Sequence, residues 1–301
     1  MPILSMAMRF SVLIPTYNRP GDLIACIDSI STQDLRPSQC VIVDDGDLAV
    51  SDLAAVRRRL GSIELTYYKK DHANVRRGLS ESKNIGLKLA SEDVVFIFDD
   101  DIVLESQFLS SIMQVWDTLD SERLMGVGGL ITNARGRSGI EKLYNALFFL
   151  NASHSWDITP VGFQVWDEHI KERVKGFYVH GGLSSVRKSR ALQFPFNTFR
   201  GGRTALEDVD FCLRAKNAGY YFYMEPRARA LHNTSPVGRE NMYLYGIKES
   251  SNRLEIFRNN ASRSIRYRLW FFWSSVGWVL RQFLAGNFQK AAGMLVGLIV
   301  R

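Results

Sequence analysis

The first hundred residues alternate between short apolar runs and segments with helical spacing. The apolar runs lie at 9–15 (RFSVLIP), 40–46 (CVIVDDG), 63–68 (IELTYY) and 94–98 (VVFIF). Between them, residues 20–33, 51–60 and 79–90 repeat apolar side chains at the period of an α-helix. Strands that are apolar throughout must be covered on both faces, and helices of about three turns supply that cover. The alternation therefore predicts an α/β fold with a mostly parallel sheet flanked by helices.

The regular alternation ends after residue 101. We expect a helix near 105–119, loops over 151–175, a strand pair within 176–189 that turns at Gly181-Gly182, a helix over about 207–218 and strands near 220–231. From 241 the chain becomes helical. The predicted organisation is one domain over 1–240, with a first half at about 9–101 and a second half at about 102–240, followed by a C-terminal amphipathic helical extension over 241–301.

The C-terminal region joins a basic run to apolar segments. Five arginines and a single acid, Glu255, lie between Arg253 and Arg268, and the apolar stretches 269–286 and 291–300 follow. Both stretches are shorter than the roughly 20 residues that a straight helix needs to cross a bilayer. The tryptophans at 270, 273 and 278 and the arginines predict that 253–301 lies on a membrane surface with anionic lipid. A core helix or an oligomer interface is the alternative. Nucleic acid is not expected, because the aromatic residues cluster with aliphatic ones.

The compartment is predicted from the cysteines and the N-terminus. Cys26, Cys40 and Cys212 are widely spaced, which favours neither a disulfide framework nor a zinc site, and we expect Cys26 and Cys40 in the core. Residues 1–10 have no basic start and no long apolar stretch, so no signal peptide is expected. A cytoplasmic protein, peripheral on the inner face of the cell membrane, is the resulting hypothesis.

Acidic residues follow two of the predicted strands. Asp44 and Asp45 end the second, and Asp99, Asp100 and Asp101 end the fourth. Carboxyl ends of parallel strands meet at one edge, where open α/β sheets bind ligands. So many carboxylates require a cation or hydrogen-bond donors, and Mg²⁺ or Mn²⁺ takes one or two carboxylates together with substrate phosphates. A solvated acidic turn is the alternative.

Three further features of the sequence concern this edge of the predicted sheet. The first strand runs into Thr16 with no glycine loop, so a dinucleotide fingerprint is missing where it would have to be. Lys83 and Asn84 lie in the helix before the acidic strand, where they can meet phosphates or balance the aspartates. Glu207 and Asp208 open a later helix. Acids are common there because of the helix dipole, but such a carboxylate can also accept a proton from a hydroxyl within hydrogen-bond reach.

Five blocks of the sequence together resemble a known family. SVLIPTYNRP, VIVDDGD, GLSESKNIGLKLA, FIFDDDI and LEDVDFCLRAKNAGY, in this order over roughly 9–235, are similar to the blocks of family 2 glycosyltransferases. The resemblance implies a GT-A fold, which is Rossmann-like and binds nucleotides, with the nucleotide half at about 9–101 and the acceptor half at about 102–240. It also implies transfer of a sugar, with inversion, from a nucleotide-diphosphate donor (UDP-, dTDP- or GDP-linked) to a saccharide or lipid-linked acceptor, in polysaccharide, glycolipid or other glycoconjugate synthesis.

The resemblance also implies roles for individual residues. Asp208 would be the general base and Glu207 its neighbour at the acceptor. Gly181 and Gly182 would lie beneath the donor sugar. Asp101, with Asp99 and His232, would hold a divalent cation, Mn²⁺ or Mg²⁺. The nucleotide would be bound by Pro15, Thr16, Tyr17, Arg19, Asp44, Asp45, Lys83, Asn84, Asp99 and Asp100. The usual Ser or Asn after DDG is Asp47 here, which leaves the accepted nucleotide open.

Two other functions are compatible with the pattern. A non-catalytic relative would bind a nucleotide sugar but would need no base at Asp208. A sugar nucleotidyltransferase would also place metal-binding carboxylates at strand ends, but it would release pyrophosphate and would need no acidic pair at 207.

Overall fold

The computed structural model describes residues 8–119, 121–136, 138–152, 154–199, 205–234 and 240–299. Residues 1–7, on which most of the signal-peptide expectation rests, lie outside this set. The described strands are β1 (Phe10–Thr16), β2 (Gln39–Asp44), β3 (Glu64–Lys69), β4 (Val94–Phe98), β5 (Ile102–Leu104), β6 (Leu124–Ile131), β7 (Asp157–Ile158), β8 (Gln164–Val165), β9 (Val174–Gly176), β10 (Leu183–Arg187) and β11 (Tyr221–His232). The described helices are α1 (Pro20–Ser31), α2 (Val50–Leu60), α3 (Leu79–Leu89), α4 (Phe108–Leu119), α5 (Gly139–Leu147), α6 (Lys188–Ala191), α7 (Glu207–Asn217), α8 (Met242–Asn260), α9 (Ile265–Leu284) and α10 (Phe288–Ile299).

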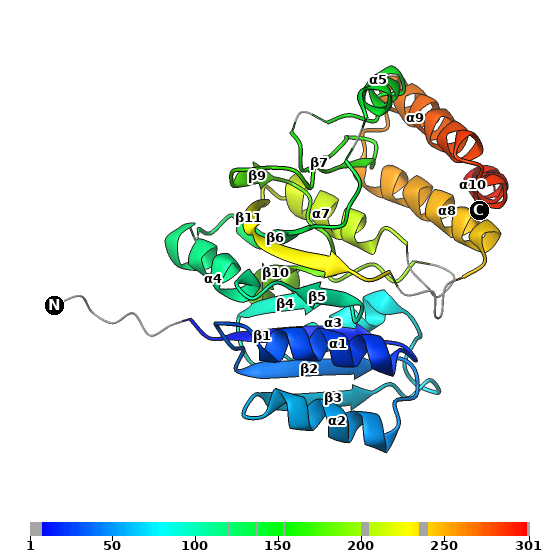
Figure 1. Ribbon diagram of the computed structural model, residues 1–301. Helices are drawn as coiled ribbons and strands as arrows, with labels where there is room; N and C mark the ends of the chain where they lie inside the picture. The colour runs from blue at the N-terminus through cyan, green and yellow to red at the C-terminus, as the bar shows by residue number, and fades with distance from the viewer. Residues whose placement is uncertain are drawn as a thin grey trace.

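One sheet organises the molecule, with strands in the order β3-β2-β1-β4-β10-β6-β11-β5 and β9 beside β11 (Figure 1). β3, β2, β1 and β4 are mutually parallel. Alternate residues of these strands enter different cores: Val12 belongs to the core with α1, α2 and α4, whereas Leu13 belongs to the core with α3 and α7. The mixed, mostly parallel sheet with flanking helices confirms the predicted fold class. Cys26 and Cys40 are buried, as expected.

The strands beyond β4 differ from the expectation. The predicted strand pair within 176–189 is wrong, because β9 pairs with β11 while β10 lies between β4 and β6, antiparallel to both. Ser185 makes a polar strand possible at this buried place, since its hydroxyl donates to the Val127 carbonyl and accepts from the Trp116 indole. The stretch 151–175, expected as loops, contains the small antiparallel pair β7–β8.

The C-terminal helices form a layer above the far end of the sheet, with α5 beside α9 (Figure 1). α10 packs closely on α8 because Gly293 and Gly297 lack side chains; an added Cβ would come within 2.0 Å of the Tyr243 carbonyl and 2.3 Å of the Ile247 carbonyl. Tyr144 of α5 donates a 2.6 Å hydrogen bond to the Gly277 carbonyl of α9. The layer is thus held by close helix contacts and individual polar bonds.

A buried acid ties the three C-terminal helices together. Glu249 of α8 lies 2.8 Å from Lys290 of α10 and 3.5 Å from Arg253, and the indole of Trp278 in α9 donates to it at 2.7 Å. Arg253 is only 2% exposed. The prediction that the whole basic run faces lipid is therefore wrong for Arg253, and Trp278 also points inward, because this acid needs their donors.

No helix in the described part of the chain is both long and apolar enough to cross a bilayer.

Candidate active site

The parallel half of the sheet creates the site. β1 has β2 on one side and β4 on the other, so the chain connections leave in opposite directions between β1 and β4. Ligands bind at such switch points, beyond the carboxyl ends of the strands. β1 ends at Thr16 and is followed by Arg19, and the segment after β4 carries the three consecutive aspartates. The structure brings these two sequence blocks together.

Asp100 is fully buried and points back toward β1. Its carboxylate accepts a 2.7 Å hydrogen bond from the Thr16 hydroxyl and lies 2.8 Å from Arg19 Nη2. Burial raises the pKa of Asp100 to about 7, although Arg19 and Thr16 oppose that rise. Part of the charge of the acidic run is therefore balanced by the protein itself.

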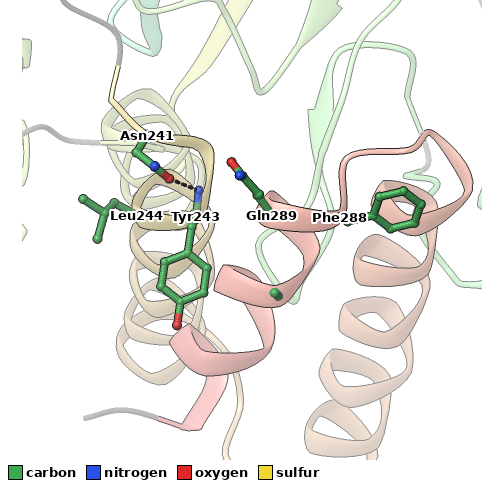
Figure 2. Close-up of a pocket in the computed structure, with 6 residues that line it drawn as sticks. Asn241, Tyr243, Leu244, Phe288 and Gln289 are labelled. Atoms are coloured by element: carbon green, nitrogen blue, oxygen red, sulfur yellow. Dashed lines mark hydrogen bonds between the residues drawn. The ribbon is translucent and has the colours of Figure 1, made fainter.

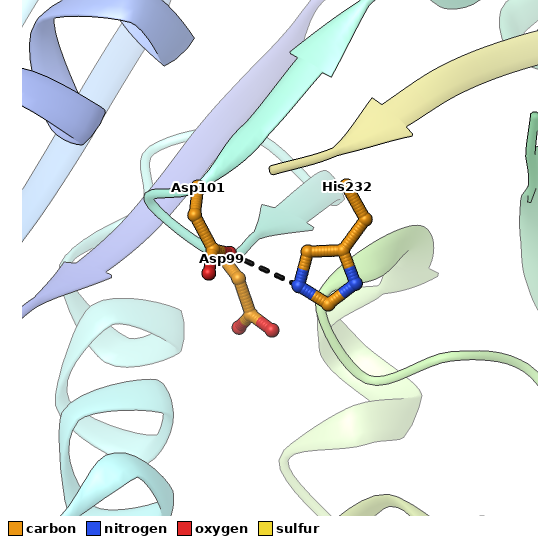
Figure 3. Close-up of side chains that lie close together, drawn as sticks. All are labelled: Asp99, Asp101 and His232. Atoms are coloured by element: carbon orange, nitrogen blue, oxygen red, sulfur yellow. Dashed lines mark ion pairs between the residues drawn. The ribbon is translucent and has the colours of Figure 1, made fainter. Parts of the chain in front are cut away.

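The other two aspartates meet His232, which ends β11 (Figure 3). One potential ligand atom from each of Asp99, Asp101 and His232 lies within 4.8 Å of the others. Asp101 Oδ1 is 3.2 Å from His232 Nε2, and Asp101 Oδ2 is 3.2 Å from Arg19 Nη1. Two carboxylates and an imidazole suit Mn²⁺, and the carboxylates alone suit Mg²⁺. The residues present therefore fit a divalent cation.

The acids after β2 are matched by protein donors. Asp44 accepts from the Gly46 and Leu48 amides at 2.8 and 3.0 Å and from the Tyr67 hydroxyl at 2.8 Å. Asp45 lies 2.7 Å from Lys70 Nζ and accepts from the Gly78 amide at 2.8 Å. These two carboxylates thus organise the loops around the site through protein groups alone and need no metal ion for it.

The remaining predicted nucleotide ligands lie on two elements. Pro15 is buried within β1, where it pairs with Val43, and Tyr17 follows the strand half-buried. In α3, Asn84 donates to the Phe196 carbonyl and accepts from the Phe196 amide, both at 2.8 Å, so its amide fastens that loop. The nucleotide-binding role of these residues stays a prediction.

Lys83 and Glu207 form a buried ion pair at 2.8 Å between α3 and α7. Burial alone would lower the pKa of Lys83, but Glu207 and Asp99 outweigh it and raise that pKa, so the ammonium is kept. Burial raises the pKa of Glu207, against the effect of Lys83. The pair joins the start of α7 to the helix that precedes the acidic strand.

Two glycines lie between the acidic run and the helix at 207. A Cβ on Gly182 would come 2.2 Å from the Asp99 carboxyl, and one on Gly181 would come 2.8 Å from Asp208 Cβ. Any side chain at either position would displace these acids. The absence of side chains at Gly181 and Gly182 therefore lets Asp99 and Asp208, which are distant in sequence, approach the same turn and share one site.

Asp208 is held at a strained helix start. Leu206, directly before α7, has a left-handed backbone with φ of 71°, a conformation that is costly for a leucine and concentrated at functional sites. Asp208 Oδ1 accepts from the Val209 amide at 2.8 Å, and Oδ2 accepts from the Tyr178 hydroxyl at 2.9 Å. The carboxylate is thus fixed in orientation and remains half-buried.

The sequence reasoning missed the residues behind Asp208. His180 Nδ1 lies 3.4 Å from the Tyr178 hydroxyl, and His180 Nε2 lies 2.6 Å from Glu168 Oε1. Tyr178 and His180 are two apart in a stretch that the sequence predicted as a strand, and two residues so spaced in a strand would share one face. Glu168 lies in an irregular stretch and gave no signal.

A groove elsewhere in the molecule is not part of this site. It has a volume of about 480 Å³ and lies between the starts of α8 and α10 (Figure 2). Its lining residues are Asn241, Tyr243, Leu244, Phe288, Gln289 and Ala292. None of these is charged, so the groove lacks what a diphosphate requires.

Sequence comparisons agree with this geometry. Residues 11–159 match the model of glycosyl transferase family 2. A stretch of 106 residues is 31% identical to the GalNAc(5)-diNAcBac-PP-undecaprenol beta-1,3-glucosyltransferase of Campylobacter jejuni and covers 35% of this chain. The same stretch covers 34% of that relative, so this chain spans about a third of it.

Solved structures share the fold. The mannosyltransferase PcManGT from Pyrobaculum calidifontis, in complex with GDP-Man and Mn²⁺, aligns with a TM-score of 0.58 at 17% identity, over 98% of this chain and 81% of that one. GalNAc-T7 with UDP, GalNAc and Mn²⁺ aligns with a TM-score of 0.61 at 14% identity, over 84% of this chain and 48% of that one. At these identities the likeness concerns the fold, which is of the GT-A type.

Proposed function

Because this chain belongs to glycosyl transferase family 2 through residues 11–159, we propose that it transfers a sugar from a nucleotide-diphosphate donor to a hydroxyl acceptor, with inversion. The observation that carries the proposal is the junction at Gly181-Gly182, where a cluster that fits a divalent cation adjoins Asp208. A donor held by the cation cluster would then lie next to an acceptor held at Asp208. Such positioning supplies much of the catalysis in a group transfer.

The donor's nucleotide would lie over the carboxyl ends of β1, β2 and β4. Pro15, Thr16, Tyr17, Arg19 and Asp45 would line the base and ribose side. Asp99, Asp101 and His232 would hold Mn²⁺ or Mg²⁺, and the ion would offset the charge that develops on the departing diphosphate. Arg19 contacts both Asp100 and Asp101, so it keeps the acidic run in place whether or not the cation is bound.

Asp208 would act as the general base. It takes the proton of the acceptor hydroxyl while the acceptor oxygen bonds to the anomeric carbon and the bond to the diphosphate breaks on the opposite face. Glu207, paired with Lys83, fixes the helix start from which Asp208 projects. A buried, hydrogen-bonded support of this kind holds a catalytic group within the tolerance that the reaction needs.

A donor panel tests the reaction type. The full chain is incubated with UDP-, dTDP- and GDP-sugars and Mn²⁺, and the released products are separated. Release of a nucleoside diphosphate from one donor is the expected result. Pyrophosphate formation from a nucleoside triphosphate and a sugar phosphate would instead identify a nucleotidyltransferase, and donor binding without turnover would identify a non-catalytic relative.

The base is tested by Asp208→Asn. The amide keeps the shape but cannot take the proton, so turnover should fall by about 10²- to 10⁴-fold. Asp117→Asn on the exposed side of α4 is the matched control and should turn over like the parent. Unchanged turnover of Asp208→Asn would refute the assignment of the base.

We further propose that α9 and α5 attach the protein to an anionic membrane surface. Seven basic residues and no acidic residue follow Glu255, and they equal the net charge of the whole chain, +7. The outward face of α9 exposes Leu269 and Phe272 to 62% and 65%, and neighbouring α5 exposes Ile140 to 82%. Exposed apolar side chains beside exposed arginines such as Arg266 and Arg268 fit the interface of an anionic bilayer.

This placement suits a lipid-linked acceptor at the inner face of the cell membrane. The Campylobacter jejuni relative is named for an acceptor on undecaprenol diphosphate. Attachment through α5 and α9 would keep the site at the end of the sheet near the surface where such acceptors are anchored. A saccharide acceptor in polysaccharide synthesis would also be reached there.

Vesicle flotation tests the attachment. The chain should float with vesicles of phosphatidylglycerol and phosphatidylcholine at low salt and less with phosphatidylcholine alone. Arg266→Glu combined with Arg268→Glu should reduce flotation several-fold. Arg57→Glu combined with Arg58→Glu, on exposed α2 positions, is the matched control. Equal loss in both pairs would mean that only net charge matters, and equal flotation with neutral vesicles would contradict the role of anionic lipid.

A further inference from the structure

The side chains behind Asp208 form a continuous hydrogen-bonded row. The Tyr178 hydroxyl lies between two groups, 2.9 Å from Asp208 Oδ2 and 3.4 Å from His180 Nδ1. His180 Nε2 lies 2.6 Å from Glu168 Oε1, and Glu168 Oε2 accepts from the Ile131 amide at 2.8 Å. Tyr178 is 3% exposed, and the Glu168 side chain is 4% exposed. The row therefore runs from the half-buried base into the interior.

The acceptors at the inner end decide where the hydrogens lie. Glu168 Oε2 accepts from the Ile131 amide, and an ionised carboxylate has no hydrogen to donate, so the hydrogen of the 2.6 Å His180–Glu168 contact is assigned to His180 Nε2. In the neutral imidazole, Nδ1 then carries a lone pair that faces Tyr178. Burial and the nearby Asp208 raise the pKa of Tyr178, so its hydroxyl keeps its proton. One hydroxyl hydrogen thus has two acceptors in reach.

Aromatic rings fix this arrangement. The Trp156 ring stacks on Tyr178 at an interplanar angle of 16° and meets His180 edge-on at 5.2 Å. Trp166 meets His180 from another direction at 5.9 Å. The Trp156 indole donates to the Asp167 carbonyl, next to Glu168. The imidazole is held on several sides, so its two nitrogens keep their partners.

We propose that Tyr178, His180 and Glu168 form a hydrogen-bond switch that positions Asp208 in both of its protonation states. This rests on the proposed function, in which Asp208 receives the acceptor's proton. Before transfer, Tyr178 donates to the Asp208 carboxylate. After transfer, Asp208 carries the proton and donates it to the Tyr178 oxygen, and the Tyr178 hydrogen turns to His180 Nδ1. The proton stays on Asp208 and every polar atom keeps a partner, so Asp208 need not move during the reaction.

Tyr178→Phe is the principal test, because it keeps the ring and removes only the hydroxyl. With the nucleotide sugar that is turned over in the donor panel, kcat should fall by about 10- to 100-fold, the worth of a hydrogen bond to a charged group. The donor KM should stay within about twofold, since the hydroxyl that is removed bonds to Asp208 and His180, which are not among the residues assigned to the nucleotide. Tyr221→Phe loses a hydroxyl bonded to Ser121 and is the matched control, expected to keep the parental kcat.

A double variant separates positioning from a merely structural role. In the Asp208→Asn background, Tyr178→Phe should cause little further loss of kcat, because the two residues act as one unit. His180→Phe keeps an aromatic ring and should lower kcat less than Tyr178→Phe does, with donor KM again unchanged. A full and independent loss in the double variant, or a parallel rise in donor KM, would overturn the switch.

The outcomes also distinguish this inference from the function on which it rests. If Asp208→Asn is inactive and Tyr178→Phe behaves like the parent, the switch is wrong and the base assignment stands. If Asp208→Asn is fully active, the assignment of the base is wrong. Urea unfolding of each variant establishes that the compared proteins are folded.

Discussion

The parallel half of the sheet and the C-terminal helices differ in where their apolar side chains lie: the first encloses them in the protein, whereas the second leaves many of them in solvent. In β1, β2 and β4, alternate residues enter two continuous cores, and every apolar side chain is enclosed by the protein. In α8–α10 the enclosed clusters are small, and α9 and α10 leave apolar side chains in solvent. A region that encloses its own apolar surface can hold a buried, prepositioned site, whereas one that leaves it open has surface for an outside partner.

The strongest test of this difference is whether turnover and membrane attachment can be lost separately. Asp101→Ala removes a carboxylate of the cation cluster and should lower turnover by at least about 10³-fold, as expected when charge stabilisation is lost, while vesicle flotation is kept. Phe272→Glu should abolish flotation and leave turnover of a water-soluble acceptor unchanged. If both variants lose both properties, the two regions are not independent.

The same substitution in the two regions compares their cores. Phe96 is fully buried in β4, whereas Phe272 of α9 is 65% exposed. Phe96→Ala should lower the free energy of unfolding by about 3–5 kcal/mol. Phe272→Ala should change it by less than about 0.5 kcal/mol. Urea unfolding measures both, and a large loss at Phe272 would mean that this face is covered by another part of the chain or by a second copy.

Two arginines of the basic run divide it into a structural and a surface part. Arg253→Met leaves Glu249 with Lys290 as its remaining cation and should cost about 3 kcal/mol, the low end for breaking a buried pair. Arg258→Met, at an exposed position of the same helix, should cost less than about 0.5 kcal/mol. Equal unfolding midpoints for the two variants would contradict the structural role of Arg253.

The smallest expected effect is a pH dependence of the C-terminal helices. Burial alone would raise the pKa of Glu249, but Lys290 and Arg253 outweigh burial and hold that pKa below its ordinary value. The stabilisation is therefore present above the unfolded pKa, about 4.3, and is lost as the pH falls through the lower folded pKa. The parent should exceed Glu249→Gln in unfolding free energy at pH 6, and the gap should narrow below pH 4. A gap that does not change with pH would contradict this.

The local sequence pattern was enough to predict the parallel half of the sheet, because strand composition, helix length and the positions of the acids all indicate the same architecture. Strands such as VVFIF are apolar at every position, the helices between them have the right length, and the acids stand where those strands end. The parallel α/β sheet and the gathering of the strand-end acids at one edge follow from that regularity, whereas the GT-A type was implied by the resemblance of five sequence blocks to family 2 glycosyltransferases. His232 lies beside Asp99 and Asp101, the two residues with which the family resemblance grouped it.

Tertiary structure decided what depends on distant partners. The sequence does not distinguish the buried Arg253 from the exposed Arg258, because burial is set by Glu249 and by the helices that close over it. Nor does it reveal that β10 passes between β4 and β6, since strand order depends on partners that are distant in sequence. It also does not reveal that Glu168, in an irregular stretch, reaches His180. Sequence by itself determined the strand-end acids and the kind of chemistry they fit. Only the folded chain determined which protein donors hold them, because hydrogen bonds and burial are set by neighbours in space.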